Sequence, residues 1–369
     1  MRRRIMVFGV APGAIGLLVF GIVVSLSGGH PGIPNNTSTT TTTTLAHPHV
    51  STTRGVGVMT LSYEDRSRET YNYTTGRTTA GRVITAEVRY ETARGHSTAE
   101  TPNAPILRGA AHPVIVFAPG YRHRAEDYEA LLDDWVNAGY VVVTLGFPDT
   151  AFPASDVPYR AGLPHGIPET DMFNEPSDVA YVLSQLAVGA SDKSNVLHGV
   201  IDPARVFLAG HSDGATVIAA FLYDANNHTP GITIRASAIM SGAELPISGQ
   251  NYGQPSTPVP MLVVQSAADR CNPPDASVAL YNAVAGPKYF LELLHASHVG
   301  SYDGTDTAAT AVVAATTTAF FDIYGGTTKA SSAAHLAQVG TVNGVSTLTG
   351  VSTAAAIPTP AGAASCPAD

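Results

Sequence analysis

Residues 205–215 read Arg-Val-Phe-Leu-Ala-Gly-His-Ser-Asp-Gly-Ala, and this stretch decides the expected fold. It joins an apolar strand, Val206 to Ala209, to a helical run, Ala215 to Tyr223, through the pattern G-x-S-x-G. In this pattern a tight, strained turn exposes the central serine above a sheet. Glycines stand two residues before and after the serine because side chains there would collide. The stretch therefore predicts a nucleophile elbow with Ser212 as the nucleophile, as in serine hydrolases.

Strands and helices alternate along the rest of the chain. Largely apolar runs predict buried strands at 114–118, 141–145, 206–209, 236–240, 261–265 and 289–294, and the run 114–118 is apolar without a break. Helices are predicted at 127–138, 175–186, 215–223 and 306–324, the first two with their apolar residues on one face. Two alternating segments, 56–62 and 83–90, predict antiparallel strands. The expected fold class is α/β: an α/β-hydrolase fold with a mostly parallel central sheet, an antiparallel N-terminal start and helices on both faces.

Acid and base candidates follow the later strands. In this fold the catalytic residues come in the order serine, acid, histidine. Asp269 lies just past a buried strand and is the expected acid, with Asp275, deeper in the loop, as the alternative. Two histidines, His295 and His298, follow the next strand. We choose His298 as the base because His295 lies too close to the strand end to reach across the elbow.

Backbone donors are needed for the oxyanion of a tetrahedral intermediate. One expected donor is the N–H of Asp213, directly after the nucleophile. The other is the N–H of Tyr121, in the loop that follows the strand 114–118. The candidate substrate-binding residues are Tyr121, Arg122 and His211. The alternatives are simple packing for Tyr121, local packing within the elbow for His211 and a solvated loop for Arg122.

Four segments are expected along the chain: a signal peptide or signal anchor (1–27), a Thr-rich disordered linker (28–54), the catalytic domain (55–350) and a C-terminal tail (351–369). Arginines 2–4 precede an apolar stretch, as in an export signal. We favour cleavage before Gly28 over an uncleaved membrane anchor, and expect a secreted or cell-surface anchored protein. The Pro-rich connection 148–174 is expected to form a wall or partial lid over the site, or else a long surface loop.

Composition and cysteine count limit the possible binding partners and the possible disulfide bonds. The 369-residue chain carries a formal net charge of −9, which argues against nucleic acid because phosphate binding needs a basic face. No histidine and carboxylate cluster has metal-ligand spacing, so we expect no metal and no cofactor. We expect the protein to be a monomer. Cys271 and Cys366 allow one disulfide, which would tie the tail to the Asp269 loop. Alternatively, Cys271 is a free thiol and Cys366 pairs between chains or stays free.

These motifs resemble those of the extracellular α/β-hydrolases grouped with platelet-activating-factor acetylhydrolases, chlorophyllases and "predicted dienelactone hydrolases". The resemblance covers about residues 55–350 and rests on 117–121, 175–186, 201–205, 210–214, Asp269 and 291–298. The segments 119–121 and 290–298 are also similar to those of bacterial cutinases and polyester hydrolases. There are departures. Dienelactone hydrolases use a cysteine where this chain has Ser212, and polyester hydrolases carry a tryptophan where it reads Ser241-Gly242-Ala243-Glu244-Leu245.

The leading functional hypothesis is a secreted serine carboxylester hydrolase that acts through an acyl-enzyme on short to medium acyl esters. Its partner would be a small-molecule or polymer ester substrate. The alternatives are a polyester hydrolase or cutinase-like enzyme, a lipase, and a serine amidase or peptidase with the same triad. A non-catalytic binding module is disfavoured because Ser212, Asp269 and His298 are all present.

Overall fold

In the computed structural model, the described residues are 55–72, 76–92, 99–148, 168–223, 229–242, 259–327, 332–350 and 353–361. They belong to one compact unit, which begins at Val50. The expected signal segment, the linker, most of the Pro-rich connection and Cys366 lie outside the described residues. Among the described residues, no helix is long and apolar enough to cross a membrane.

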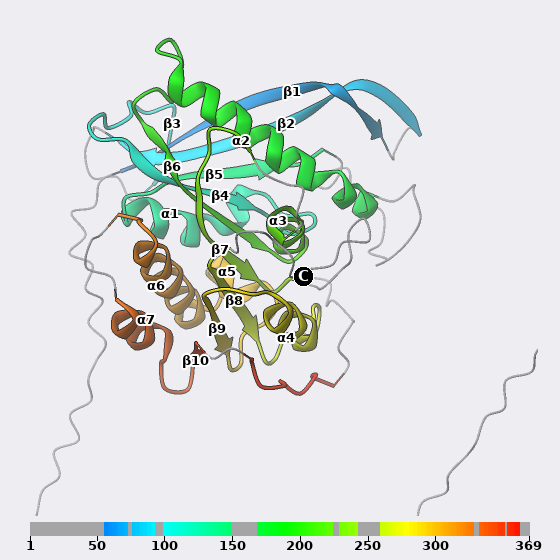
Figure 1. The fold of residues 1–369 in the computed structure, drawn as a ribbon, viewed down its shortest axis with the longest axis vertical. Helices are drawn as coiled ribbons and strands as arrows, with labels where there is room; N and C mark the ends of the chain where they lie inside the picture. Colours follow the sequence, from blue (N-terminus) through cyan, green and yellow to red (C-terminus); the bar gives the residue numbers. More distant parts are fainter. Residues whose placement is uncertain are drawn as a thin grey trace, which may run out of the picture. The chain divides into compact units, whose positions relative to one another are not determined.

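A sheet of ten strands organises the described residues, in the order β10-β9-β8-β7-β6-β4-β5-β2-β1-β3 (Figure 1). The strands are β1 (Val56–Asn72), β2 (Arg77–Glu91), β3 (Thr101–Pro102), β4 (His112–Ala118), β5 (Val141–Gly146), β6 (Ile201–His211), β7 (Ile234–Met240), β8 (Met261–Ser266), β9 (Lys288–Leu293) and β10 (Ser346–Thr349). Within the described part of the chain, the strands from β5 to β9 in this order pair in parallel. β2 pairs antiparallel with β1 and β5, and β10 pairs antiparallel with β9. This arrangement confirms the expected mostly parallel sheet with an antiparallel start.

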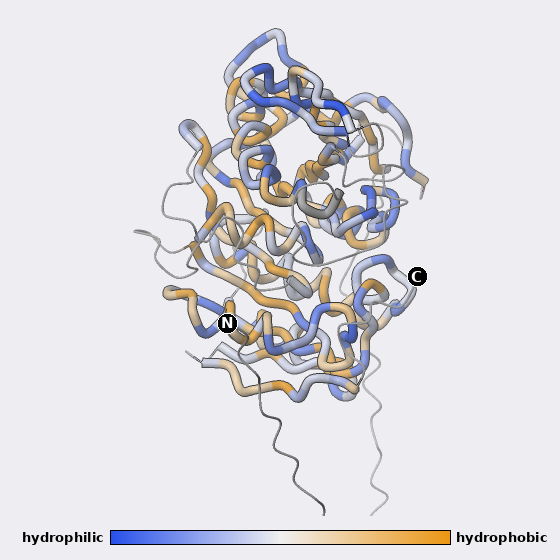
Figure 2. Tube along the Cα trace, turned by 90° about the vertical axis from the view of Figure 1, so that its right-hand side faces the viewer, coloured by the Kyte–Doolittle hydropathy of each residue, from blue (hydrophilic) through white to orange (hydrophobic). Residues whose placement is uncertain are grey.

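Helices cover both faces of the sheet (Figure 1). One face carries α1 (Glu129–Asn137), α5 (Gly300–Asp303), α6 (Thr307–Ile323) and α7 (Ala333–Gly340). The other face carries α2 (Glu175–Ser191), α3 (Asp213–Tyr223) and α4 (Pro274–Ala283). Figure 2 shows apolar stretches running through the interior of this unit. The two apolar layers explain why the middle of the sheet is apolar without a break over 114–118 in β4 and 206–209 in β6.

Strand β4 shows how the sequence pattern produces this layering. Successive side chains of a strand point to opposite faces. Val114, Val116 and Ala118 belong to the core under α2 and α3, whereas Ile115 and Phe117 belong to the core under α1 and α6. All five are completely buried. A strand of this kind fits only the middle of a sheet that is covered twice.

The N-terminal hairpin extends beyond its predicted strands. β1 and β2 continue through residues 63–72 and 77–82, where the apolar alternation is lost. Arg82 lies in this extension with only 1% of its surface exposed, and its guanidinium binds the carboxylates of Asp171 and Asp178. Arg68 also binds Asp178, at 2.6 Å. Buried ion pairs, rather than apolar alternation, therefore attach this part of the hairpin to α2.

The C-terminal part adds elements that the periodicity of the sequence does not predict. They are α4, α7 and β10, the last of which completes the sheet beside β9. A short 3-10 helix, η1 (Ala125–Tyr128), precedes α1, and another, η2 (Pro168–Phe173), precedes α2. Cys271 is disulfide-bonded. Because Cys366 lies outside the described residues, its pairing with Cys271 stays a prediction.

Candidate active site

The elbow forms where β6 ends and α3 begins. Ser212 adopts a φ of 54°, in the left-handed region that a serine rarely occupies. A Cβ at Gly210 would lie 2.7 Å from the nitrogen of Ala215, and a Cβ at Gly214 would collide with the carbonyl of Ala118. The turn therefore closes only with glycines on both sides of Ser212.

Ser212, His298 and Asp269 come together in a hydrogen-bonded row at the carboxyl ends of three parallel strands. The Ser212 Oγ lies 2.9 Å from His298 Nε2, and His298 Nδ1 lies 2.8 Å from Asp269 Oδ2. Asp269 follows β8 and is fully buried, while His298 follows β9 and is half-buried. In the neutral form of the ring, His298 donates from Nδ1 to the carboxylate, which leaves Nε2 to accept the serine proton.

Asp269 is held by its own loop. Its Oδ1 accepts the backbone N–H groups of Cys271 and Asn272, at 2.9 and 3.0 Å. Its Oδ2 accepts the side chain of Gln265, at 3.2 Å, in addition to His298. These donors fix the fully buried carboxylate in place. A fixed carboxylate can in turn hold the imidazole in one tautomer and stabilise the imidazolium.

Tyr121 and Asp213 lie side by side next to Ser212. Both line a small pocket together with Gly120 and Phe147. A Cβ at Gly120 would lie 3.2 Å from the Cβ of Ser212, so the loop after β4 lies directly against the nucleophile. The backbone N–H of Asp213 belongs to the first residue of α3, at the positive end of the helix dipole. This position suits the binding of an oxyanion.

A buried hydrogen-bonded chain connects the loop after β4 to the loop of His298. The Gly120 N–H donates to Tyr128 Oη at 3.0 Å, Tyr128 Oη lies 2.8 Å from His211 Nδ1, and His211 Nε2 lies 3.0 Å from the backbone oxygen of His298. Burial is the main cause that holds the pKa of His211 well below its usual value, and His298 and His123 add to it. The neutral ring must donate from Nε2 to the carbonyl, so Nδ1 accepts from Tyr128.

These hydrogen bonds correct the expectation that His211 binds substrate. His211 is among the candidate substrate-binding residues of the sequence analysis, but the structure leaves 0% of it exposed. Its ring centroid lies 4.4 Å from that of Tyr302 with the ring planes tilted by 43°, and both of its nitrogens are hydrogen-bonded. His211 therefore supports the site from beneath, because the elbow directs the residue before the nucleophile into the core. Tyr121 is half-buried and Arg122 is exposed, at a φ of 64°.

The alternative acid and base lie elsewhere. Asp275 is exposed in the first turn of α4, and His295 is exposed in the loop after β9. Sequence reasoning also missed Asn272, whose Nδ2 lies 3.4 Å from Ser212 Oγ and donates to the backbone oxygen of Ser241 at 2.7 Å. Its only sequence signal is its place three residues after Asp269.

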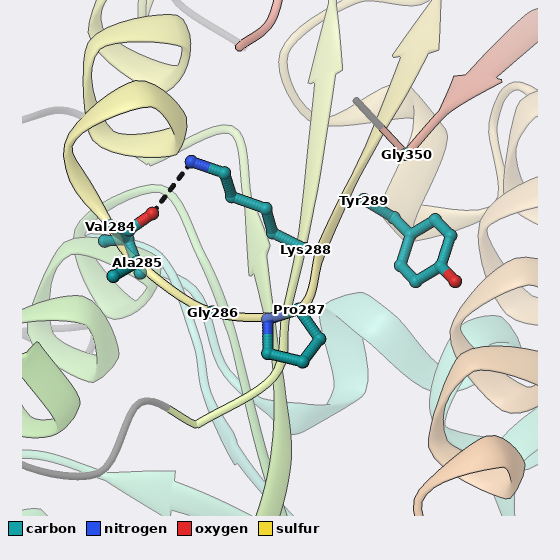
Figure 3. Close-up of a pocket in the computed structure, with 7 residues that line it drawn as sticks. All are labelled: Val284, Ala285, Gly286, Pro287, Lys288, Tyr289 and Gly350. Atoms are coloured by element: carbon teal, nitrogen blue, oxygen red, sulfur yellow. Dashed lines mark hydrogen bonds between the residues drawn. The ribbon is translucent and has the colours of Figure 1, made fainter. Parts of the chain in front are cut away.

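A larger pocket of about 430 Å³ lies at the opposite end of the strands (Figure 3). It is formed by the turn between α4 and β9 and by Gly350, just past β10. The Lys288 ammonium, at the amino end of β9, donates to the backbone oxygen of Val284 at 2.8 Å. Ligand sites of parallel sheets lie at the carboxyl ends of the strands. The smaller pocket at the elbow is therefore the candidate site.

The sheet, its helical layers and the elbow define the α/β-hydrolase fold. No family model matches the sequence, and no curated protein matches it. Among solved structures, the chain is similar to a ferulic acid esterase from Streptomyces cinnamoneus, with a TM-score of 0.55 and 19% identity. The match covers 78% of this chain and 96% of that one. At this identity the likeness is one of fold.

Proposed function

We propose that this protein is a serine carboxylester hydrolase that acts through Ser212, His298 and Asp269. The observation that carries the proposal is the unbroken hydrogen-bonded row at a strained elbow. The structural neighbour is named as a ferulic acid esterase, which agrees with this proposal. Strained backbone at Ser212 is costly and is typical of a site that uses it.

The proposed reaction proceeds in two halves. His298 Nε2 takes the proton of Ser212 as the Oγ attacks the ester carbonyl carbon. The N–H groups of Asp213 and Tyr121 bind the oxyanion. His298 then gives the proton to the leaving alcohol, and an acyl-serine remains. In the second half, water attacks the acyl-serine with His298 again as base, the serine leaves with the proton returned by His298, and Asp269 holds the imidazole in place.

Short to medium acyl esters are the proposed substrates. The pocket lined by Tyr121, Phe147 and Asp213 has a volume of only about 10 Å³, roughly that of one water molecule, which disfavours long acyl chains at this point. We also propose that the protein belongs to the group of platelet-activating-factor acetylhydrolases and chlorophyllases. Cutinase-like, lipase and amidase activities are the competing possibilities.

A labelling and kinetic experiment tests the proposal. A fluorophosphonate is expected to modify Ser212, as located by peptide mass spectrometry, and Ser184→Ala serves as the control because Ser184 lies on α2 with its hydroxyl bonded to Tyr181. Turnover is then compared among p-nitrophenyl acetate, butyrate, octanoate and palmitate to find the preferred acyl-chain length. Turnover of acetanilide measures amide cleavage under the same conditions. Label on another residue, or turnover of the anilide above the esters, would contradict the proposal.

The proposed function includes export of the chain and a disulfide bond between its two cysteines. We infer that the segment 1–27 directs the chain out of the cell as a cleaved signal or an anchor, that the enzyme is a monomer, and that Cys271 pairs with Cys366. Peptide mapping without reduction is expected to give one linked pair of peptides from a monomer. Two free thiols, or a linked dimer, would refute the intramolecular bond.

A further inference from the structure

Asn272 connects the loop of the catalytic acid to the nucleophile. It is buried, with 4% of its surface exposed. Its backbone N–H donates to Asp269 Oδ1 at 3.0 Å, and its backbone oxygen accepts from Gln265 Nε2 at 3.1 Å. Its side-chain Nδ2 donates to the backbone oxygen of Ser241 at 2.7 Å and lies 3.4 Å from Ser212 Oγ. Both the backbone and the side chain of Asn272 are therefore held in place beside the nucleophile.

The carbonyl of Ser241 decides which end of the Asn272 amide faces Ser212. A backbone carbonyl oxygen only accepts hydrogen bonds, so the atom that lies 2.7 Å from it must be the nitrogen Nδ2 rather than Oδ1. An amide nitrogen carries two hydrogens. One of them is donated to Ser241, and the other is available to Ser212 Oγ. Asn272 therefore presents a donor to the nucleophile.

Ser241 adds an independent observation. It lies directly after β7, is completely buried and has a φ of 50°, in the same left-handed region as Ser212 at 54°. Its backbone N–H donates to the backbone oxygen of Val264 at 2.8 Å, and its Oγ lies 2.8 Å from Tyr302 Oη. Strained residues persist only where the surrounding contacts hold them, and they gather at active sites. The carbonyl that orients Asn272 thus belongs to a second strained residue beside the elbow.

The direction of the Ser212 hydrogen follows from this arrangement. A hydroxyl group has one hydrogen to donate and can also accept. Because Nδ2 of Asn272 can only donate, Ser212 Oγ accepts at that contact. Its own hydrogen is then left for His298 Nε2, at 2.9 Å. This is the direction in which the proton must move for Oγ to become a nucleophile.

We propose that Asn272 is a further catalytic residue, which donates a hydrogen bond to Ser212 Oγ when that oxygen carries developing negative charge. This inference rests on the proposed function. In acylation, the Oγ proton passes to His298 Nε2 while the bond from Oγ to the ester carbon forms. In the second half that bond breaks, its electron pair stays on Oγ, and His298 returns the proton. The resting contact of 3.4 Å is long, and catalytic hydrogen bonds often tighten only in the transition state.

Asn272→Leu tests the proposal, since it removes both N–H groups with little change in volume. We expect kcat for p-nitrophenyl acetate to fall about 10- to 100-fold, the effect of one hydrogen bond to a charged group, with KM nearly unchanged. Asn272→Asp keeps the shape without the two N–H donors and is expected to lower kcat at least as far. Thr317→Val on α6 is the matched control, because it also leaves a buried polar group, the Trp135 indole N–H, without its partner at 2.8 Å. Urea unfolding measures the loss of stability in each variant.

The Ser212→Ala background separates action through Oγ from a structural role. Without Oγ, Asn272→Leu is expected to leave the residual rate of ester cleavage unchanged, because residues that act as a unit are not additive. A further fall of the residual rate, a wild-type kcat in Asn272→Leu, or an equal fall in Thr317→Val would overturn the proposal. These outcomes leave the proposed function intact. A wild-type protein that neither cleaves esters nor reacts with a fluorophosphonate would instead refute the proposed function, and this inference with it.

Discussion

The elbow and the outer part of the N-terminal hairpin both bury polar groups, but by different means. At the elbow, His298 is hydrogen-bonded to both Ser212 and Asp269, so its Nε2 can accept the serine proton. In the hairpin, Arg82 is enclosed by Asp171 and Asp178, and its burial serves attachment. A catalytic arrangement keeps one group reactive, whereas a structural one satisfies every charge. Variants in the two regions should therefore lose different properties.

The largest effect is expected for His298→Ala. Loss of the base should lower kcat by about 10⁴-fold or more, with thermal stability nearly unchanged. His295→Ala is the control, because His295 is exposed and outside the hydrogen-bonded row. Steady-state kinetics with p-nitrophenyl acetate checks the ranking, and the reverse order would move the base to His295.

Arg82→Met should act on the other region. It leaves two buried carboxylates, Asp171 and Asp178, without their main partner, and removal of one member of a buried ion pair costs about 3–5 kcal/mol. We expect the midpoint of urea unfolding to drop accordingly, while kcat of the folded protein stays close to wild type. Arg66→Met is the control, since the Arg66 side chain is 85% exposed. A clear fall in kcat of the folded Arg82→Met protein would contradict this expectation and would mean that the hairpin contributes to the site.

Tyr128→Phe sharpens the comparison within the site. It removes the hydroxyl between Gly120 and His211 and leaves two buried polar groups unsatisfied, at a cost of about 1–3 kcal/mol. Because the loop of Tyr121 loses an anchor, we expect kcat to fall about 10-fold with little change in KM. Phe290→Leu, a core change far from this chain of hydrogen bonds, measures the effect of stability alone. Equal losses in both variants would reduce Tyr128 to a packing residue.

The smallest effect concerns pH. Burial raises the pKa of Asp133 to about 7, and the nearby Glu100 carboxylate adds to the shift. The folded state therefore holds a proton that the unfolded chain releases above about pH 4, so the free energy of unfolding declines as pH rises from about 4 to 7. Asp133→Asn should flatten this decline, as measured by urea unfolding at pH 5 and pH 8. Glu69→Gln, at an exposed carboxylate, should not.

Local chemistry explains what could be predicted. The elbow depends on residues within five positions of one another, so the spacing of Gly210, Ser212 and Gly214 reveals it directly. The central strands show up because a strand buried on both faces must be apolar throughout. Asp269 and His298 follow from the order of strands in the fold. The apolar pattern could not reveal the hairpin extension, where Arg82 meets Asp178 across 96 positions of sequence.

The sequence by itself determined the class of fold, the place of the nucleophile and the candidates for its partners, because these depend on backbone sterics and on apolar periodicity. Only the tertiary structure placed His298, and not His295, within hydrogen-bonding distance of Ser212, buried His211 beneath the site and brought Tyr128 and Asn272 to it. Such contacts join residues that are far apart in the chain, and their geometry exists only once the strands and loops have packed.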